Sequence, residues 1–157
     1  MFSRLVSVCD PRHVPRVRSA SLWNMDPIRP TVLVVDDDAS LRSALESVLT
    51  SRGYRVLTTG EPDNAYDLLA HASVDAVLID VRLPTISGLA LSLAIAYRWP
   101  HLRDRIAFMT ADAGAPDVRT WLQAHHSTVF PKPFRCEQLA HWLDATLQQR
   151  DRHATGS

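Results

Sequence analysis

Residues 31–38 read TVLVVDDD, an apolar run that ends in three consecutive aspartates. An uninterrupted run of this kind, rich in β-branched residues, predicts a short strand that is covered on both faces. A second run with the same plan, AVLID at residues 76–80, also ends in an aspartate. Further strands are predicted at residues 54–59, 106–109 and 129–130, where apolar and β-branched residues cluster again.

Segments with helical spacing of apolar residues follow each of these strands. The predicted helices lie near residues 41–49, 64–71, 89–97, 118–125 and 139–147. Five successive strand–helix units predict a parallel sheet with helices on both faces. Pro131 has no N–H for a ladder hydrogen bond, which places the fifth strand at an edge. The predicted fold class is therefore α/β, a flavodoxin-like (βα)5 doubly wound parallel sheet with strand order 2-1-3-4-5.

Length and composition indicate one globular domain with polar ends. The 157 residues are 46% hydrophobic and 22% charged, which is ordinary for a soluble domain. Residues 1–30 form an arginine-rich, basic extension without periodicity, which we expect to be disordered. Residues 31–148 form the predicted domain, and residues 149–157 a short polar tail.

Charge and cysteine content argue against several classes of protein. Lys plus Arg balance Asp plus Glu at 17 each, so bulk charge gives no reason to expect nucleic-acid binding by this chain. Two cysteines are too few for a disulfide scaffold and indicate a reducing compartment. No apolar run approaches the ~20 residues of a membrane span. We therefore predict a cytoplasmic protein that does not contact a membrane.

Acidic, hydroxyl and basic side chains lie at the ends of four predicted strands. Asp36 and Asp37 follow the first strand, Asp80 follows the third, Thr110 the fourth and Lys132 the fifth. Ligands of open α/β sheets bind outside the carboxyl ends of the strands, beside the switch point between strands one and three. Mg²⁺ relieves the repulsion of clustered carboxylates and leaves coordination positions for a phosphoryl group. The sequence thus predicts a phosphoryl-transfer site with a carboxylate nucleophile.

Four blocks of sequence carry a resemblance to a known family. They are VLVVDDD at 32–38, LIDVRLP at 78–84 with Ser87-Gly88, MTA at 109–111, and KPF at 132–134. In order and spacing these blocks resemble the receiver domain of two-component response regulators. The wording DDDASLR at 36–42 and DVRLP at 80–84 looks most like the FixJ-type receivers.

The resemblance implies roles for the residues at the strand ends. Asp80 would be the phosphoacceptor, and a sensor histidine kinase or phosphotransfer protein would donate the phosphoryl group. Thr110 and Lys132 would contact this group and catalyse its transfer. Four groups would hold Mg²⁺: Asp36, Asp37, Asp80 and the backbone carbonyl of Arg82. The implied partners beyond the donor are a downstream protein and a second copy of the chain, in a homodimer that forms on phosphorylation.

Two features depart from the pattern of the family. Receivers usually carry an aromatic residue three positions before the lysine, where this chain has Val129. The small pair that commonly precedes that strand is replaced by His125-His126. We therefore expect an unusual signalling face on the fourth helix, fifth strand and fifth helix. Two residues after the phosphoacceptor and after the threonine, Arg82 and Asp112 are expected to pair across the mouth of the site.

Several functions stay open at the level of sequence. Because the chain ends soon after the last predicted helix, we expect a single-domain regulator that acts by protein contact. One alternative is a DNA-binding transcriptional regulator whose output domain is missing here. Another is a receiver-like module that signals without phosphate, which the valine at position 129 favours. The last is a haloacid-dehalogenase-like phosphohydrolase, since DDDAS at 36–40 fits the start of that family, with Asp36 as the nucleophile.

Overall fold

The computed structural model describes the backbone of residues 28–154 and the side chains of residues 28–148. The predicted basic extension therefore lies almost entirely outside the described residues, as does the end of the predicted tail. The elements are β1 Thr31–Val35, α1 Ala39–Ser51, β2 Arg55–Thr59, α2 Pro62–His71, β3 Ala76–Asp80, α3 Gly88–Arg98, the 3-10 helix η1 Pro100–Leu102, β4 Ile106–Thr110, α4 Pro116–Ala124, β5 Thr128–Pro131 and α5 Cys136–Ala154.

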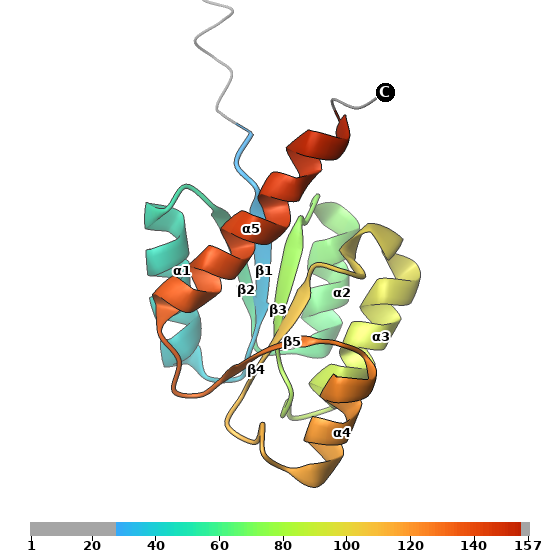
Figure 1. Cartoon of the computed structure of the whole chain (residues 1–157). Coiled ribbons are helices and arrows are strands. Elements are labelled where there is room, and N and C mark those ends of the chain that lie inside the picture. Colours follow the sequence, from blue (N-terminus) through green and yellow to red (C-terminus); the bar gives the residue numbers. More distant parts are fainter. Residues whose placement is uncertain (1–27, 155–157) are drawn as a thin grey trace, which may run out of the picture.

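The strands form one parallel sheet in the order β2-β1-β3-β4-β5. Figure 1 shows their carboxyl ends toward the bottom of the view, with α1 and α5 on one face of the sheet and α2, α3 and α4 on the other. Among the described strands, β5 pairs with β4 alone, so the strand that carries Pro131 lies at an edge. The predicted fold class and strand order are confirmed.

Alternate side chains of the central strands enter two separate cores. In β1, Leu33 and Val35 belong to the core beneath α2, α3 and α4, whereas Val32 and Val34 belong to the core beneath α1 and α5. All residues of β1 and of β3 are buried. Burial on both faces explains why these strands are continuous apolar runs rather than alternating patterns. The two strands that carry the predicted acids are therefore fixed from both sides.

Helix α1 has residues that suit a helix terminus at both of its ends. The Asp38 carboxylate accepts hydrogen bonds from the N–H groups of Ser40 at 2.9 Å and Leu41 at 3.2 Å, which makes it an N-cap. Beyond the last turn, Gly53 adopts φ +92°, a left-handed conformation that glycine reaches without a Cβ clash. Asp38 fixes where α1 begins, directly after the aspartates, and Gly53 fixes where the chain leaves it.

Two element boundaries differ from the prediction for physical reasons. The helix η1 was not predicted, and it forms because Pro100, which ends α3, also suits the first position of a new helical turn. Helix α5 continues through Ala154, into the short polar tail predicted for residues 149–157. Residues 149–154 contain neither Gly nor Pro, so nothing in the chain stops the helix there. Within the part of the chain that the structure describes, no helix is long and apolar enough to span a bilayer.

Candidate functional site

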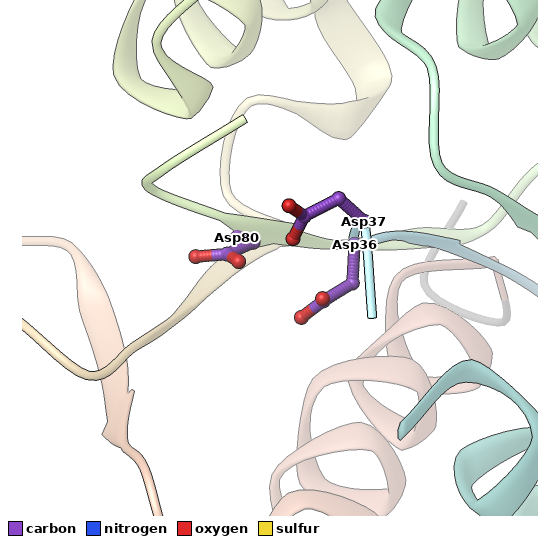
Figure 2. A group of neighbouring side chains, drawn as sticks. All are labelled: Asp36, Asp37 and Asp80. Carbon is purple, nitrogen blue, oxygen red and sulfur yellow. The ribbon is translucent and has the colours of Figure 1, made fainter. Parts of the chain in front are cut away.

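Three carboxylates meet where β1 and β3 end. Parallel pairing sets Val35 beside Ile79, so the chain leaves the two strands side by side at Asp36 and Asp80. Carboxylate oxygens of Asp36, Asp37 and Asp80 all lie within 4.8 Å of one another. Figure 2 shows the three side chains gathered at these two strand ends. The structure therefore brings together the three acids that the sequence predicts to share one site.

Asp36 is the inaccessible member of this cluster. Its Oδ1 accepts a hydrogen bond from the Asp38 N–H at 2.9 Å, and its Oδ2 accepts one from Lys132 Nζ at 2.7 Å. Its backbone carbonyl accepts a third from Arg42 Nη1 at 2.6 Å. Asp36 has no exposed surface, and a buried charge is tolerated only when it is paired and hydrogen-bonded. These contacts fix the orientation of the carboxylate.

Lys132 joins the carboxylates of two strands. Its Nζ lies 2.7 Å from Asp36 Oδ2 and 3.2 Å from Asp80 Oδ2, and 22% of its side chain is exposed. Burial lowers the pKa of Lys132, but the hydrogen bond and charge of Asp36, together with Asp80, outweigh burial and leave the pKa above its usual value. Lys132 therefore stays protonated at neutral pH and offsets part of the negative charge.

Asp80 ends β3 in the middle of the sheet. Its Oδ1 accepts a hydrogen bond from the Arg82 N–H at 3.1 Å, and its Oδ2 faces Lys132. Burial is the main cause that raises the pKa of Asp80, and the charge of Asp36 raises it further. The Arg82 N–H and Lys132 lower this pKa, but the net direction is upward. One lysine thus does not offset the burial and mutual repulsion of these acids.

Thr110 and Arg82 complete the predicted set of residues. Thr110 is fully buried at the end of β4, and its hydroxyl oxygen accepts a hydrogen bond from the Asp112 N–H at 3.0 Å. Because Met109 pairs with Asp80, Thr110 lies one residue further along the same edge of the sheet. Arg82 reaches Asp80 through its backbone N–H, while its Nε lies 3.0 Å from Asp112 Oδ2. The predicted pairing of Arg82 with Asp112 is confirmed.

The sequence analysis missed two supports of this site. Arg42 projects from α1 to the Asp36 carbonyl, and Gly60 leaves room for it, since a Cβ there would lie 2.9 Å from Arg42 Nη1. Gly88 starts α3 directly over the end of β3, where a Cβ would lie 2.0 Å from the Asp80 carbonyl oxygen. A glycine at the end of a strand or the start of a helix was the available signal for both close approaches.

The region of α4 and β5 shows what surrounds Val129, where receivers usually carry an aromatic residue. Val129 is half-buried against the core beneath α4. Phe130 belongs to the opposite core, with its ring 6.2 Å from that of Trp142, so it does not take the place of an aromatic at 129. His126 follows α4 at φ +50°. Asp117, in the first turn of α4, lies 3.8 Å from Arg82 Nη2, a contact that the sequence analysis did not predict.

The chemistry of the acid cluster fits a hard divalent cation. All its donors are carboxylate oxygens, which Mg²⁺ and similar ions prefer, and Mg²⁺ needs only one or two of them beside water. Two unit charges about 4 Å apart repel by roughly 4 kcal/mol at an effective dielectric constant near 20. Asp37 is exposed, which leaves one side of the cluster accessible. A cation at this point would relieve repulsion that Lys132 leaves in place.

Comparison with protein families connects this geometry to a known domain. A family model for the response regulator receiver domain matches residues 32–144, which include all the site residues described above. The chain belongs to this family. The receiver is the phosphoacceptor module of two-component response regulators, which agrees with the predicted function.

Curated relatives extend well beyond the length of this receiver. The response regulator MprA of Mycobacterium sp. (strain KMS) is 32% identical over 123 residues, which cover 78% of this chain and 52% of that protein. The DNA-binding response regulator MtrA of Mycobacterium tuberculosis (strain ATCC 25618 / H37Rv) is 30% identical over 127 residues, which cover 81% and 54%. The chain thus spans about half the length of these relatives.

Solved receiver structures have the same fold. The chemotaxis protein CheY4 of Vibrio cholerae superimposes with a TM-score of 0.67 at 26% identity, over 75% of this chain and 98% of that chain. The response regulator TrrA of Thermotoga maritima, solved in complex with Mg(2+)-BeF, gives a TM-score of 0.63 at 25% identity, over 74% and 98%. That receiver was thus solved with Mg²⁺, an ion that suits the carboxylate donors described above.

Proposed function

We propose that Asp80 of this receiver accepts a phosphoryl group from a sensor histidine kinase or a phosphotransfer protein. The observation that carries the proposal is the position of Lys132 Nζ, 2.7 Å from Asp36 and 3.2 Å from Asp80, beside three clustered carboxylates. Lys132 and Asp36 are 96 residues apart in the sequence. An ammonium held between two acids at the open end of a sheet is suited to an anion that binds together with a cation.

Asp80 is the best placed nucleophile among the three acids. Asp36 has no exposed surface, so a phosphoryl donor from solvent does not reach its carboxylate. Asp37 is exposed at the outer side of the cluster. Asp80 lies between the acids that follow β1 and the residues contributed by β4 and β5, and 6% of it is exposed. A phosphoryl group on Asp80 would thus have Lys132 and Thr110 as neighbours.

The proposed reaction is a simple displacement at phosphorus. A carboxylate oxygen of Asp80 attacks the phosphorus, and a new O–P bond forms as the P–N bond of the donor histidine breaks. The electron pair of the broken bond stays on the histidine nitrogen, so nothing is oxidised or reduced. Lys132 offsets the charge of the phosphoryl oxygens, and the Thr110 hydroxyl donates a hydrogen bond to one of them.

A bound Mg²⁺ would neutralise charge on the phosphoryl oxygens during transfer. The groups proposed to hold it are Asp36, Asp37, Asp80 and the backbone carbonyl of Arg82. The carboxylate donors of the cluster support this assignment, because their mutual repulsion falls when a cation binds. Removal of divalent cations with a chelator should therefore abolish phosphorylation of the chain.

Intact-mass spectrometry with acetyl phosphate tests the proposal. The wild-type chain with Mg²⁺ should gain one phosphate-sized adduct, which Asp80→Asn should lack. Asp67→Asn, at an exposed acid on α2, is the matched control and should gain the adduct. An adduct that survives Asp80→Asn but is lost in Asp36→Asn would favour the phosphohydrolase. A folded wild-type chain that binds Mg²⁺ and gains no adduct from acetyl phosphate or a kinase would favour a phosphate-independent module.

We propose a cytoplasmic, FixJ-like receiver that acts on a downstream protein as a single domain. A second candidate is the receiver of a DNA-binding transcriptional regulator, favoured by the finding that MtrA is a DNA-binding protein of about twice this span. Coding sequence that continues in frame beyond Ser157 into a helix-turn-helix domain would decide for the second candidate.

We also propose that phosphorylation promotes a homodimer through the face formed by α4, β5 and α5. This face departs from the family pattern at Val129, yet it adjoins the site through the end of β4. Sedimentation velocity with Mg²⁺ and beryllium fluoride, a phosphoryl analogue, tests this. A shift toward dimer that Asp80→Asn lacks is expected, and equal sedimentation with and without the analogue would contradict the dimer.

A further inference from the structure

Arg82 links the loop after β3 to the segment that leads into α4. Its Nε lies 3.0 Å from Asp112 Oδ2, and its Nη2 lies 3.8 Å from Asp117 Oδ2. Asp112 belongs to the turn after β4, and Asp117 to the first turn of α4. One guanidinium therefore pairs with two carboxylates on either side of the start of the helix. We refer to these two ion pairs as the Arg82 link.

Both ends of the Arg82 link are tied to the site through the backbone. The Arg82 N–H donates to Asp80 Oδ1 at 3.1 Å, and the Asp112 N–H donates to the Thr110 hydroxyl at 3.0 Å. The guanidinium thus belongs to a residue whose main chain already touches Asp80.

Helix α4 lacks a side-chain cap at its start and buries few of its residues. Its N-cap residue, Ala115, has no side-chain oxygen to accept from the first N–H groups. Only Val118 and Leu122 of the helix are buried. Surface hollows flank it on two sides. One of about 500 Å³ lies toward α3 and includes Trp121 in its lining, and one of about 360 Å³ lies beside Val129.

We propose that Arg82 is the residue through which a phosphoryl group on Asp80 reaches α4. In the unphosphorylated chain, Arg82 holds the start of α4 through Asp112 and Asp117. After phosphorylation, the guanidinium leaves these two carboxylates and pairs with the phosphoryl oxygens. This inference rests on the proposed role of Asp80 as phosphoacceptor, and it requires no aromatic residue at position 129.

Charge and exposure determine the direction of this exchange. The side chains of Arg82 and Asp112 are 56% and 50% exposed, and that of Asp117 is 71% exposed. Solvent-exposed ion pairs of this kind are weak. A phosphoryl group carries up to about two negative charges and three acceptor oxygens, which suit the planar fork of an arginine. The phosphoryl group is therefore the stronger partner for the same guanidinium.

Departure of Arg82 leaves two unpaired acids at the start of α4. Asp112 then faces the added negative charge of the phosphoryl group without a counterion, which favours movement away from the site. Asp117 remains favourable where it is, because the amino end of a helix attracts negative charge. The Arg82 link then no longer holds the first turn of α4 or the segment before it, and the two hollows lie beside the second half of the helix.

Hydrogen–deuterium exchange over residues 111–120 tests the link in the unphosphorylated chain. Arg82→Gln should speed exchange by about twofold to fivefold, the range expected for the loss of weak ion pairs. The double variant Asp112→Asn, Asp117→Asn should do the same from the other side. Arg119→Gln removes an exposed arginine from α4 outside the link and serves as the matched control. Equal exchange in Arg82→Gln and wild type would overturn the inference.

Binding of beryllium fluoride with Mg²⁺ tests the exchange of partners, with ¹⁹F NMR as the readout. Arg82→Gln should bind the analogue about twofold to fivefold more weakly, because it lacks the new contact. The double Asn variant should bind it more tightly, because Arg82 is already released. In the Arg82→Gln background the same two Asn substitutions should have no effect, which separates the link from a general change in charge. Tighter binding of beryllium fluoride by the triple variant than by Arg82→Gln alone would overturn the inference.

The ¹⁹F spectra and the exchange rates together separate this inference from the proposed function. A wild-type chain that shows no bound ¹⁹F signal with Mg²⁺, or a signal that persists in Asp80→Asn, contradicts the phosphoacceptor role and the link with it. A bound signal that depends on Asp80, without faster exchange over residues 111–120, leaves the phosphoacceptor role intact and overturns the link alone. A bound signal with faster exchange in wild type, and no further change in Arg82→Gln, supports both.

Discussion

Helices α1 and α4 follow the strands on either side of β3, and the chain holds them in opposite ways. Helix α1 begins at Asp38, whose carboxylate caps two N–H groups, and ends before Gly53, which takes the left-handed conformation without strain. Helix α4 begins after Ala115, which has no capping side chain, and is followed by His126, which takes the left-handed conformation with a Cβ. Residues of α1 and its flanks therefore stabilise both ends of that helix, whereas α4 depends on contacts with other elements.

This difference matches the task of each region. The acids that would hold a cation must stay within a few tenths of an ångström of their positions, and β1, Asp38 and Arg42 fix them from several sides. A segment that reports the state of the site must instead move at small cost, and such segments have few buried contacts. A side-chain cap thus holds the start of α1, whereas the start of α4 at the same edge of the sheet has none.

The largest expected contrast comes from the two ion-pair networks. Lys132→Met leaves Asp36 buried without its cation, and we expect it to lower the free energy of unfolding by about 3 kcal/mol or more without Mg²⁺. Arg82→Gln removes exposed ion pairs and should cost less than about 1 kcal/mol. Urea unfolding of both variants measures this. A similar cost for the two would break the contrast between the rigid and the mobile region.

Two glycines give the next largest contrast. Gly88→Ala places a Cβ 2.0 Å from the Asp80 carbonyl oxygen, so the backbone must shift, and we expect a loss of about 2 kcal/mol or more. Gly114 lies before α4, where an added Cβ meets nothing within 4 Å. Gly114→Ala should therefore change stability by no more than about 0.5 kcal/mol in the destabilising direction. Thermal unfolding of the two variants checks this, and a costly Gly114→Ala would mean that the segment before α4 is closely packed.

The raised pKa of Asp80 predicts a dependence of stability on pH. The folded chain binds the Asp80 proton more tightly than the unfolded chain, so this residue lowers stability progressively as the pH rises from the ordinary carboxyl range to the folded pKa. Without divalent cations, Asp80→Asn should therefore exceed wild type in stability by a margin that grows with pH across this window and then stays constant. Unfolding by urea at a series of pH values measures the margin.

Asp67→Asn provides the control for this pH series, because the residue is an exposed acid on α2 away from the site.

Addition of Mg²⁺ at 100 times its dissociation constant should stabilise the wild type by about 2.7 kcal/mol. The gain should be smaller in Asp80→Asn, which lacks one carboxylate. A margin between Asp80→Asn and wild type that shrinks as the pH rises would contradict the direction given for the Asp80 pKa.

The smallest expected effects concern the ends of the two helices. His126→Gly removes a Cβ from a left-handed residue and should raise the free energy of unfolding by about 0.5 kcal/mol. Gly53→Ala introduces the same penalty at the end of α1 and should lower it by about 1 kcal/mol. Denaturant midpoints of both variants check the opposite signs. A gain from Gly53→Ala would show that the two helix ends do not differ as described.

The sequence was sufficient for the sheet and for the residues it brings together. Continuous apolar runs specify buried parallel strands, and the topology then places Asp36, Asp80, Thr110 and Lys132 at one edge whatever the side-chain details. The pairing of Arg82 with Asp112 was also predicted, but from the resemblance to receivers, because these residues stand two positions after the phosphoacceptor and the threonine. The placement of the four site residues needs only the order of the strands and the positions where they end.

What the sequence did not predict depends on distances between side chains. The contact of Arg42 with the Asp36 carbonyl requires the angle at which α1 leaves β1. The approach of Asp117 to Arg82 requires the position of the first turn of α4. The left-handed conformation of His126 is uncommon for any residue other than glycine, and hydrophobic periodicity gives no sign of it. Such features follow from packing, which a pattern of residue types does not encode.

The salt bridge between Lys132 and Asp36 also sets an order of events during synthesis. Asp36 is translated 96 residues before the lysine that neutralises it. A nascent chain that has released only β1 to β4 from the ribosome holds its acids without the ammonium between them. The acid cluster therefore gains its ammonium only when β5, the last strand, has been made.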